Sequence, residues 1–417
     1  ASGSLTAPQV VITSGNVTLD SASTNIGTLA ASGVSGLLVR DSNALTMGTV
    51  GATTGISASG NIDIATVSDD LTLATNVMTT STSTSALMLN AGLSAAAGTA
   101  SGGNLVISGS PSLSVGSGGR ATLSSGSISG STGLTSLLGS GSGRFRYNSD
   151  ETTTNYTTAL GTGLYAIYRE QPSLTVTSDN QTMTYGNALP TLTFSVSGVN
   201  GDTAAQIFST NPTVSAGGST STSGNLTAGT HSLTGSGGVN QLGYAIGTYV
   251  PGTLTVNQKP LAYTGTATDK VYDGNTAATL SHAASGMVSG DSVTFSGTGA
   301  FANKNVETNK TVAITGLTAG GTDGGNYILA STASSAASIT PKTVTVSGLT
   351  ASNKVYDGTT AATVTSSGVT FGGLIGGDNL SLSSVGGTFA MKHVGTNKTV
   401  SLSSTYGGMD LGNYTIT

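Results

Sequence analysis

The sequence predicts an all-β protein: the C-terminal end of a right-handed parallel β-helix, followed by a tandem array of small, Ig-like β-sandwich modules. Three observations predict this fold. Apolar and polar residues alternate in many short segments, such as GNVTLD and TLTFSVSG, with Gly, Asn and Ser as turn residues between them. Aromatic residues are absent from the first third of the chain. A ten-residue phrase recurs 84 residues later with nine of its ten positions identical.

The composition excludes several classes of protein. Charged residues make up 7% of the 417 residues, against about 25% in an ordinary soluble protein, but the strand-like alternation distinguishes this chain from a flexible linker. The absence of Cys excludes disulfide scaffolds, thiol catalysis and thiolate metal sites. A net charge of −5 argues against nucleic acid as a partner. No apolar run approaches the length of about 18 residues that spans a membrane, so no membrane insertion is expected.

Residues 1–170 are predicted to form the end of the β-helix. The first 143 residues contain no Phe, Tyr or Trp and only seven charged residues, although aromatic side chains usually dominate a globular core. A β-helix explains this composition, because each coil stacks small and aliphatic residues on the like residues of the next coil. Strand-like segments are expected at about 20 residues per coil.

A cap for the β-helix is expected from about residue 144, where the composition changes. Residues 144–170 contain five aromatic and six charged residues. The end of a β-helix exposes core and unpaired backbone, and therefore needs a covering segment. We interpret the five aromatic residues as that cap, in preference to an aromatic platform that binds sugars, because they lie where the solenoid pattern stops. They are Phe145, Tyr147, Tyr156, Tyr165 and Tyr168.

Three modules are expected after the β-helix. Residues 171–257 contain strand patterns with turn signals at intervals of about 8–12 residues, as in a small β-sandwich. Residues 258–341 and 342–417 are copies of each other. KVYDGNTAAT begins at Lys270 and KVYDGTTAAT at Lys354, and both copies continue with NKTV and GNY in the same order.

The repeated phrase is interpreted as scaffold. Asp273 and Asp357 each begin an Asp-Gly turn, in which Gly is free to adopt positive φ. Tyr272 and Tyr356 precede these turns and are expected to pack their rings at the edge of each domain. A repeated ligand site would use the same residues. However, the similarity extends along the whole domain and the divergence falls in loops, which favours a copied module.

The second copy ends before one expected strand. In the first copy GNYILA is followed by the alternating segment STASSAASIT, whereas the second copy stops at GNYTIT. A sandwich that lacks its last strand has unpaired backbone groups and an uncovered strip of core. We therefore expect the domain at 342–417 to be truncated at its last strand, less ordered than 258–341, and continued beyond Thr417 in the natural chain.

No pattern predicts a catalytic or metal site. The three histidines fall in three different predicted domains, and none has a second His or a carboxylate at a metal-ligand spacing. No Ser lies in a nucleophile elbow, and the Gly-rich segments lack the Lys and the helix of a phosphate-binding loop. We therefore expect no catalytic, cofactor-binding or metal residues and no cofactor, and the ligand-binding residues are unknown. The histidines are His231, His282 and His393.

The carboxylates of the β-helix are the remaining candidates, because glycoside hydrolysis needs two acids across one cleft. Asp69 and Asp70 are the only close pair. Neighbouring residues on a strand point to opposite faces, so this pair can act together only within a turn, where it could also bind Ca²⁺ weakly. We favour neither role. The candidates are Asp20, Asp41, Asp63, Asp69 and Asp70.

The Asn-X-Ser/Thr sequons do not predict glycosylation. The chain has eight, about as many as chance gives in a sequence so rich in Asn, Ser and Thr. They begin at Asn16, Asn155, Asn180, Asn225, Asn309, Asn379, Asn397 and Asn413.

The order of these segments resembles the filamentous-haemagglutinin-like secreted adhesins of Gram-negative bacteria, the exoproteins of two-partner secretion. GRATLSSGSISGSTGL and GSGRFRYNSDETTTNYTTALGTGLYAIYREQP look like the last coils of their β-helix. LTVTSDNQTMTYGNALPTLTFSVSG resembles their MBG (mostly-β, Gly-rich) domain, and the two KVYDG copies resemble their YDG domains. The resemblance implies a protein at the cell surface or secreted, exported through an outer-membrane secretion partner.

We therefore expect part of an extracellular adhesin or fibre rather than an enzyme. It would attach the cell to matrix polysaccharide, other cells or a host surface, as in a biofilm, through an unidentified polysaccharide or cell-surface ligand. One alternative is a carbohydrate-active enzyme, a lyase or glycosidase, on the β-helix. A second is a passive stalk. Short linkers that contain Pro also predict an elongated particle.

Overall fold

The structure, a computed structural model, describes residues 4–21 and 23–417 and confirms the all-β class. The two α-helices are short, α1 (Leu134–Leu138) and α2 (Ala204–Ile207). The chain forms two compact units. The first contains 1–181, 190–217 and 231–254, and the second contains 182–189, 218–230 and 255–417.

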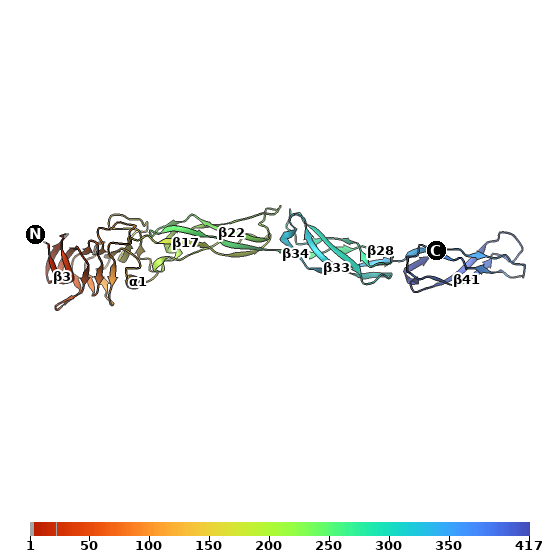
Figure 1. Ribbon diagram of the computed structural model, residues 1–417, viewed down its shortest axis with the longest axis horizontal. Coiled ribbons are helices and arrows are strands. Elements are labelled where there is room, and N and C mark those ends of the chain that lie inside the picture. The colour runs from red at the N-terminus through yellow and green to blue at the C-terminus, as the bar shows by residue number, and fades with distance from the viewer. Residues whose placement is uncertain (1–3, 22) are drawn as a thin grey trace. The chain divides into compact units, whose positions relative to one another are not determined.

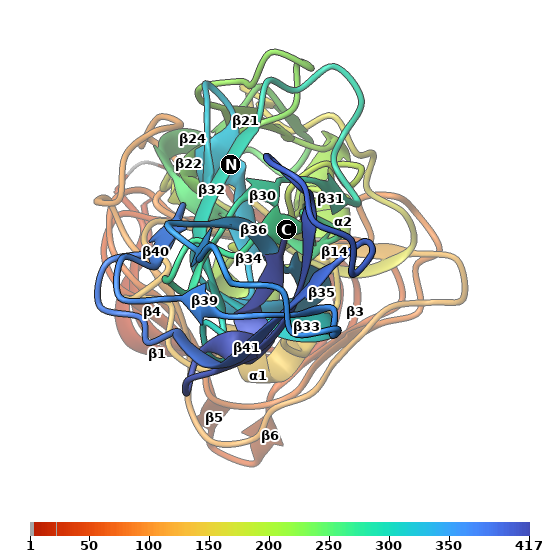
Figure 2. The same ribbon diagram turned by 90° about the vertical axis from the view of Figure 1, so that its right-hand side faces the viewer.

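The first unit begins with a parallel β-helix (Figure 1). The long strand β3 (Asn25–Asp41) pairs in parallel with the first strand of each of three ladders. A short hairpin of β5 (Thr49–Val50) and β6 (Thr53–Thr54) projects from the coils (Figures 1 and 2). The first ladder is β8 (Ile62–Thr66), β11 (Leu87–Ala91), β14 (Arg120–Ser125) and β16 (Gly163–Tyr168). The second is β4 (Leu45–Met47), β9 (Leu71–Leu73) and β12 (Leu105–Ile107), and the third is β7 (Ile56–Ala58), β10 (Val77–Thr79) and β13 (Leu113–Ser114).

The β-helix core consists of stacked aliphatic columns. Leu37 pairs with Ile62 and Ile62 with Leu87, each 25 residues from the next, and all three are buried. Leu87 then pairs with Ala121, and Ala121 with Leu164, so the later coils are 34 and 43 residues long. The expected coil of about 20 residues is therefore too short for these coils. Loops outside the strands lengthen a coil without changing its core, and strand patterns alone do not reveal their length.

The aromatic segment covers the end of this core. Phe145, Tyr147 and Tyr168 are fully buried, and their rings stack with centroids 6.4 Å and 5.7 Å apart. Tyr156 and Tyr165 are half-buried, and the Arg146 guanidinium lies 5.5 Å from each ring centroid. Three of the five rings are thus buried within the protein, where no sugar can stack on them.

The next module lies at residues 172–257. In the first unit, β17 (Ser173–Ser178) pairs antiparallel with β19 (Phe194–Val196) and parallel with β24 (Ala245–Val250). In another sheet, β21 (Thr213–Gly217) pairs antiparallel with β22 (Gly229–Ser236). The far end of this module, at 182–189 and 218–230, belongs to the second unit.

The first KVYDG copy has a three-stranded and a five-stranded sheet, a two-stranded sheet of β27 (Thr266–Ala267) and β30 (Leu280–Ser281), and a small core of Phe301, Val312, Ile314, Ala337 and Ile339. Its small sheet has the order β31 (Ala284–Ser285), β26 (Lys259–Tyr263), β34 (Tyr327–Leu329). Its large sheet has the order β28 (Lys270–Val271), β35 (Thr332–Thr340), β33 (Glu307–Gly320), β32 (Thr294–Phe301), β29 (Ala277–Ala278).

The second KVYDG copy has the same small sheet but a shorter large one. The small sheet has the order β40 (Thr370–Gly372), β36 (Lys342–Ser347), β43 (Tyr414–Ile416). The large sheet has only the three strands β38 (Ala361–Ala362), β41 (Ser381–Phe389) and β42 (Val400–Gly407). Counterparts of β28 and β35 are not present in residues 342–417. As a result Leu402 is 46% exposed, whereas its counterpart Ile314 in the first copy is fully buried.

Candidate functional site

The structure does not bring the three histidines together. His231 is buried in β22. His282 lies in the first KVYDG copy, where its Nδ1 is 2.9 Å from the Tyr263 hydroxyl. His393 lies in an exposed loop of the second copy, and its carbonyl accepts a hydrogen bond from Lys398. Each histidine therefore has a separate local environment. The residues described at 4–21 and 23–417 contain no cluster of three His, Asp or Glu that could hold a metal ion.

The carboxylates of the β-helix hold its own backbone. Asp41 is fully buried, and its two oxygens accept hydrogen bonds from the backbone N–H groups of Ile26 and Asn43. Burial raises the pKa of the Asp41 carboxyl, although these two hydrogen bonds act in the opposite direction. Asp63 forms a bidentate pair with Arg40 at 2.7 Å and 2.9 Å. These contacts are structural, and they do not form a catalytic pair.

The Asp69–Asp70 turn also has a structural role. The Asp70 carboxylate accepts a hydrogen bond of 2.7 Å from the backbone N–H of Asn104 on the next coil. The Asp69 carbonyl accepts a hydrogen bond from the Thr66 hydroxyl. Asp20 is exposed.

In the part of the chain that the structure describes, no helix is long and apolar enough to cross a membrane.

A different group of residues recurs at the ends of the modules. It contains a Tyr from one module and an Asp and a Tyr from the next, and we call it a carboxylate–tyrosine joint. In the first unit, Tyr147 of the cap and Tyr244 both donate hydrogen bonds to Asp202 Oδ2, at 2.7 Å and 2.8 Å. The two rings pack with centroids 4.6 Å apart. All three residues are buried.

The second unit contains two more such joints, with the same arrangement of hydrogen bonds. Asp291 Oδ2 accepts hydrogen bonds of 2.5 Å from Tyr185 and Tyr327. Asp378 Oδ2 accepts hydrogen bonds of 2.7 Å from Tyr272 and 2.6 Å from Tyr414. In both joints the first Tyr precedes the Asp by 106 residues and the second follows it by 36. The ring pairs are T-shaped, with centroids 5.3 Å and 5.4 Å apart.

The residues after the first Tyr allow the modules to approach closely. Gly186 follows Tyr185, and Gly274 follows the Tyr272-Asp273 pair, with φ of 77° and 80°. A Cβ on Gly186 would lie 2.5 Å from Val288, and one on Gly274 would lie 2.9 Å from Ile375. Glycine is therefore required here by its φ and by the neighbouring module. The backbone N–H of Val288 and of Ile375 each donates to the second Tyr of its joint.

An asparagine adds a second hydrogen bond across each joint of the second unit. Asn326 Oδ1 accepts from the Ala228 N–H at 2.8 Å, and Asn413 Oδ1 accepts from the Val306 N–H at 2.9 Å. Each Asn directly precedes the second Tyr of its joint. The GNY motif therefore supplies two side chains that hold the preceding module.

The carboxyl pKa values of two of the joints are shifted in opposite directions. At Asp378, burial alone would raise the carboxyl pKa, but hydrogen bonds from Lys304, Tyr414 and Tyr272 bring the pKa below its ordinary value. Lys304 lies 2.6 Å from Asp378 Oδ1. Burial raises the pKa of Tyr414 to about 12. At Asp202 burial raises the carboxyl pKa, and the hydrogen bonds from Tyr147 and Tyr244 and the charge of Arg146 oppose this shift only in part.

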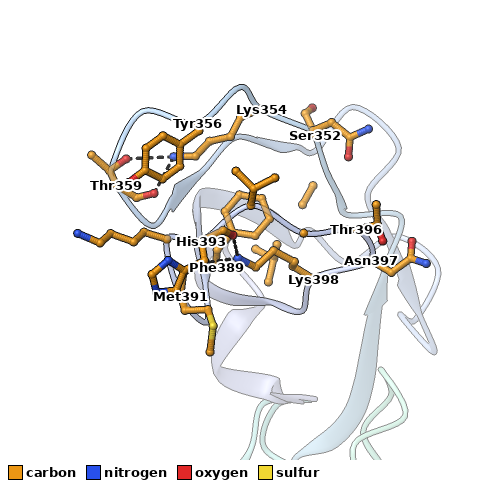
Figure 3. A pocket seen from close by; sticks show the side chains of 16 residues that line it. Ser352, Lys354, Tyr356, Thr359, Phe389, Met391, His393, Thr396, Asn397 and Lys398 are labelled. Carbon is orange, nitrogen blue, oxygen red and sulfur yellow. Dashed lines mark hydrogen bonds between the residues drawn. The ribbon is translucent and has the colours of Figure 1, made fainter.

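The second KVYDG copy presents the first half of another joint. Tyr356 corresponds to Tyr272, but it is 57% exposed where Tyr272 is 1% exposed. Gly358 has the same φ of 80° as Gly274, yet a Cβ there would meet nothing within 4 Å. Beside Tyr356 lies a cavity of about 420 Å³ between the Lys354 segment and the loop before β42 (Figure 3).

The loops around this cavity are held in the same way as in the first copy. Lys354 Nζ donates to Asp357, and Lys270 Nζ donates to Asp273 in the first copy. Figure 3 shows the Lys354 ammonium directed at Thr359 and the Lys398 ammonium at the loop that carries His393. The cavity is therefore formed by ordered loops.

Sequence patterns predicted that Tyr272 packs at the domain edge but not its partners, and the same expectation for Tyr356 is wrong, because 57% of that residue is exposed. A signal was present in the recurrence of Gly-Asp and of a Tyr preceded by Gly or Gly-Asn in every module. The three Gly-Asp pairs end at Asp202, Asp291 and Asp378. The pairing of one module's Tyr with the next module's Asp becomes visible only when neighbouring modules are seen together.

Comparison with protein families identifies the modules. The model of the MBG domain (YGX type) matches residues 174–255, and the model of the YDG domain matches residues 257–335 and 340–417. No curated protein matches the chain. The chain thus carries one MBG domain and two YDG domains after its β-helix, which supports its resemblance to adhesins with these domains.

Proposed function

We propose that this chain is part of an extracellular bacterial adhesin of the filamentous-haemagglutinin-like type, exported with an outer-membrane secretion partner. It attaches the cell to matrix polysaccharide, other cells or a host surface. The observation that carries the proposal is the series of a β-helix, an MBG domain and two YDG domains in one chain. MBG domains are typical of extracellular proteins, and the absence of Cys is compatible with export.

The carboxylate–tyrosine joints support a structural role, in which a module restricts the motion of its neighbour within the same unit. Within each unit, a Tyr side chain of one module donates a hydrogen bond to an Asp of the next. The Asp41 and Asp70 carboxylates accept hydrogen bonds from backbone N–H groups of the β-helix and Asp63 pairs with Arg40, and these contacts support a scaffold more than a catalytic groove. We therefore favour attachment, with the modules as the support of a binding surface, over a lyase or glycosidase.

A glycan array probed with the whole chain tests this function. We expect saturable binding to one class of polysaccharide, and binding of the chain to cells or matrix that carry the same glycan. The released products of a panel of uronate polysaccharides, incubated with the chain, provide the opposing measurement. Release of oligosaccharides would show that the β-helix is enzymatic. Absence of binding to glycans, cells and matrix would leave only a passive stalk.

A further inference from the structure

We propose that the Asp291 joint, where the MBG domain meets the first YDG domain, binds a calcium ion between the carboxylates of Asp291 and Asp323. The ion takes the place that the Lys304 ammonium has in the Asp378 joint. This inference does not depend on the adhesive function proposed above. It rests on the comparison of two joints that share their tyrosines and carboxylates but differ in their cation.

In the Asp378 joint a cation lies between two carboxylates. Lys304 Nζ is 2.6 Å from Asp378 Oδ1 and 3.6 Å from Asp410 Oδ1. The other oxygen of Asp378 accepts the hydrogen bonds from Tyr272 and Tyr414. Lys304 belongs to the first YDG domain and both carboxylates belong to the second. This ammonium therefore links two modules and offsets the negative charge of the joint.

The Asp291 joint has the same two carboxylates. Asp291 corresponds to Asp378, because its Oδ2 also accepts hydrogen bonds from two tyrosines. Asp323 corresponds to Asp410, because each accepts at Oδ2 a 2.8 Å hydrogen bond from the backbone N–H that follows the first Asp. Asp291 Oδ1, which corresponds to the oxygen that contacts Lys304, is buried and has no hydrogen-bond partner. A buried carboxylate oxygen without a partner is costly, and a cation beside it removes that cost.

Both carboxylates of the Asp291 joint are ionised at neutral pH. Burial alone would raise the pKa of Asp291, but hydrogen bonds from neighbouring hydroxyl groups bring this pKa below its ordinary value. Hydrogen bonds from Thr222 and from the Ser292 N–H hold the pKa of Asp323 below its ordinary value as well. Among the described residues, no Lys or Arg forms an ion pair with either carboxylate. The joint thus contains two negative charges that no side chain balances by direct contact.

A lysine close to this joint does not take the role of Lys304. Lys259 Nζ lies 3.9 Å from the position of a Cβ on Gly186, but Lys259 forms none of the ion pairs in residues 4–21 and 23–417. Its counterpart Lys342 has the same place in the sheet register of the second YDG domain. The Asp378 joint therefore has this lysine in addition to Lys304, and it is Lys304 that contacts the carboxylates.

The MBG side of the Asp291 joint supplies oxygen atoms and no charge. Its residues 182–189 and 218–230 contain no Lys, Arg, His, Asp or Glu. The hydroxyls of Ser221 and Ser223 lie 3.0 Å apart, and both lie within 3.4 Å of the Tyr185 hydroxyl. The Thr222 N–H donates to Asp323 Oδ1 at 3.1 Å. Hydroxyl groups of one module are therefore placed beside the two carboxylates of the next.

These ligands suit calcium. Carboxylate and hydroxyl oxygens bind hard cations, and Ca²⁺ accepts an irregular geometry completed by water, whereas Mg²⁺ requires a nearly ideal octahedron. A divalent ion also balances the charge of both carboxylates. Because the site has only two carboxylates, we expect weak binding, with a Kd of about 0.1–1 mM as in extracellular calcium-binding modules.

Native-state hydrogen exchange of the whole chain tests the site, because each joint has its own reporter amide. The Ala228 N–H donates across the Asp291 joint, and the Val306 N–H donates across the Asp378 joint. At about ten times its Kd, Ca²⁺ should slow the exchange of the Ala228 amide about tenfold. The Val306 amide should be unaffected, since Lys304 already lies between the carboxylates of its joint. NaCl holds the ionic strength constant.

Matched variants locate the ion. Asp323→Asn removes one of the two charges and keeps an oxygen that can accept the hydrogen bond from the Ser292 N–H. It should raise the Kd for Ca²⁺, measured by calorimetry, by about tenfold or more, because ligand charge sets calcium affinity. Asp410→Asn, the corresponding change in the Asp378 joint, should leave the Kd unchanged.

Terbium luminescence provides a readout that does not depend on the stability of the joint. Tb³⁺ replaces Ca²⁺ at oxygen sites and is excited through tyrosine rings beside it, here those of Tyr185 and Tyr327. We expect a signal that Ca²⁺ displaces, in the unmodified chain and in Asp410→Asn. Asp323→Asn should lose this signal.

Three results would overturn the proposal. The first is exchange of the Ala228 amide that does not change with Ca²⁺ at about 10 mM, well above the expected Kd. The second is equal slowing at the Ala228 and Val306 amides, or the same slowing with NaCl alone, since either would assign the effect to screening of charge. The third is an equal change of the Kd in Asp323→Asn and Asp410→Asn.

Discussion

The same substitution in the two KVYDG phrases is expected to have very different consequences. Tyr272→Phe removes the hydroxyl that donates to Asp378 Oδ2 at 2.7 Å and keeps the ring, which is 1% exposed. Tyr356→Phe removes a hydroxyl that has no hydrogen-bond partner in the described chain, on a ring that is 57% exposed. KVYDG is identical in the two copies, but Tyr272 lies in a joint and its backbone N–H bonds to Thr340 of β35, whereas Tyr356 has neither neighbour.

The size of the expected destabilisation follows from the hydrogen bond that Asp378 loses in Tyr272→Phe. A hydrogen bond to a charged group contributes about 1.5–3 kcal/mol. Asp378 keeps its contacts with Tyr414 and Lys304, both at 2.6 Å, so the carboxylate is not left unpaired and the lower part of this range applies. We expect Tyr272→Phe to destabilise the joint by about 1.5–2 kcal/mol. Tyr356→Phe should change stability by less than about 0.5 kcal/mol.

Native-state hydrogen exchange measures this change where it occurs. The Val306 N–H donates to Asn413 Oδ1 across the joint, and the Ile375 N–H donates to the Tyr414 hydroxyl. Their exchange should become about tenfold to thirtyfold faster in Tyr272→Phe, since about 1.4 kcal/mol is a factor of ten. Both amides should be unaffected by Tyr356→Phe. Equal effects of the two substitutions, or none in Tyr272→Phe, would refute the view that this carboxylate holds the modules together.

Three further outcomes are expected. Acid should weaken the Asp378 joint, because its lowered folded-state pKa contributes stability that is present above the ordinary value of 3.8 and lost as the pH falls through the folded pKa. The raised pKa of Asp202 has the opposite effect, so the stability of its joint increases as the pH falls toward 3.8. Hydrogen exchange measured from pH 6 to pH 3, and corrected for intrinsic rates, distinguishes the two joints. Arg169→Met removes the buried guanidinium that donates to Ala91 and Gly103 carbonyls at 2.7 Å and 2.9 Å, and should destabilise the β-helix end by about 3 kcal/mol in thermal unfolding. Residues 342–417 should exchange faster than 258–341, since β42 has a free edge; equal protection would contradict this.

The all-β fold class and the order of the β-helix and the modules along the chain could be predicted because they depend on local sequence patterns. Alternation predicts strands in any environment, and the absence of aromatic residues before Phe145 points to a narrow aliphatic core. The stacked columns through Leu37, Ile62 and Leu87 confirm that interpretation of the β-helix. Coil length could not be predicted, because loops outside the core add residues without any effect on the pattern within strands.

The joints could not be predicted from the residues around them. KVYDG is identical in the two copies, and yet Tyr272 is buried and Tyr356 is exposed. The difference depends on a carboxylate 106 residues away, which is supplied by another module. A repeated sequence motif therefore indicates the fold of its own module, but it does not indicate which residues of another module its side chains contact.

The use of one carboxylate by tyrosines of two modules has a mechanical consequence. Within the second unit, a pulling force along the chain loads the bonds at Asp378 together with the peptide link from β35 to β36. The few side-chain bonds of the joint are individually weaker than the long ladder between β33 and β35, so the joint opens before the sheet unravels. The link keeps Tyr272 close to Asp378 after opening, at an effective concentration in the millimolar range, roughly, so that the contact re-forms when the load is released. We therefore expect the Asp378 joint to act as a reversible element that opens under tension before the sheet of its module does.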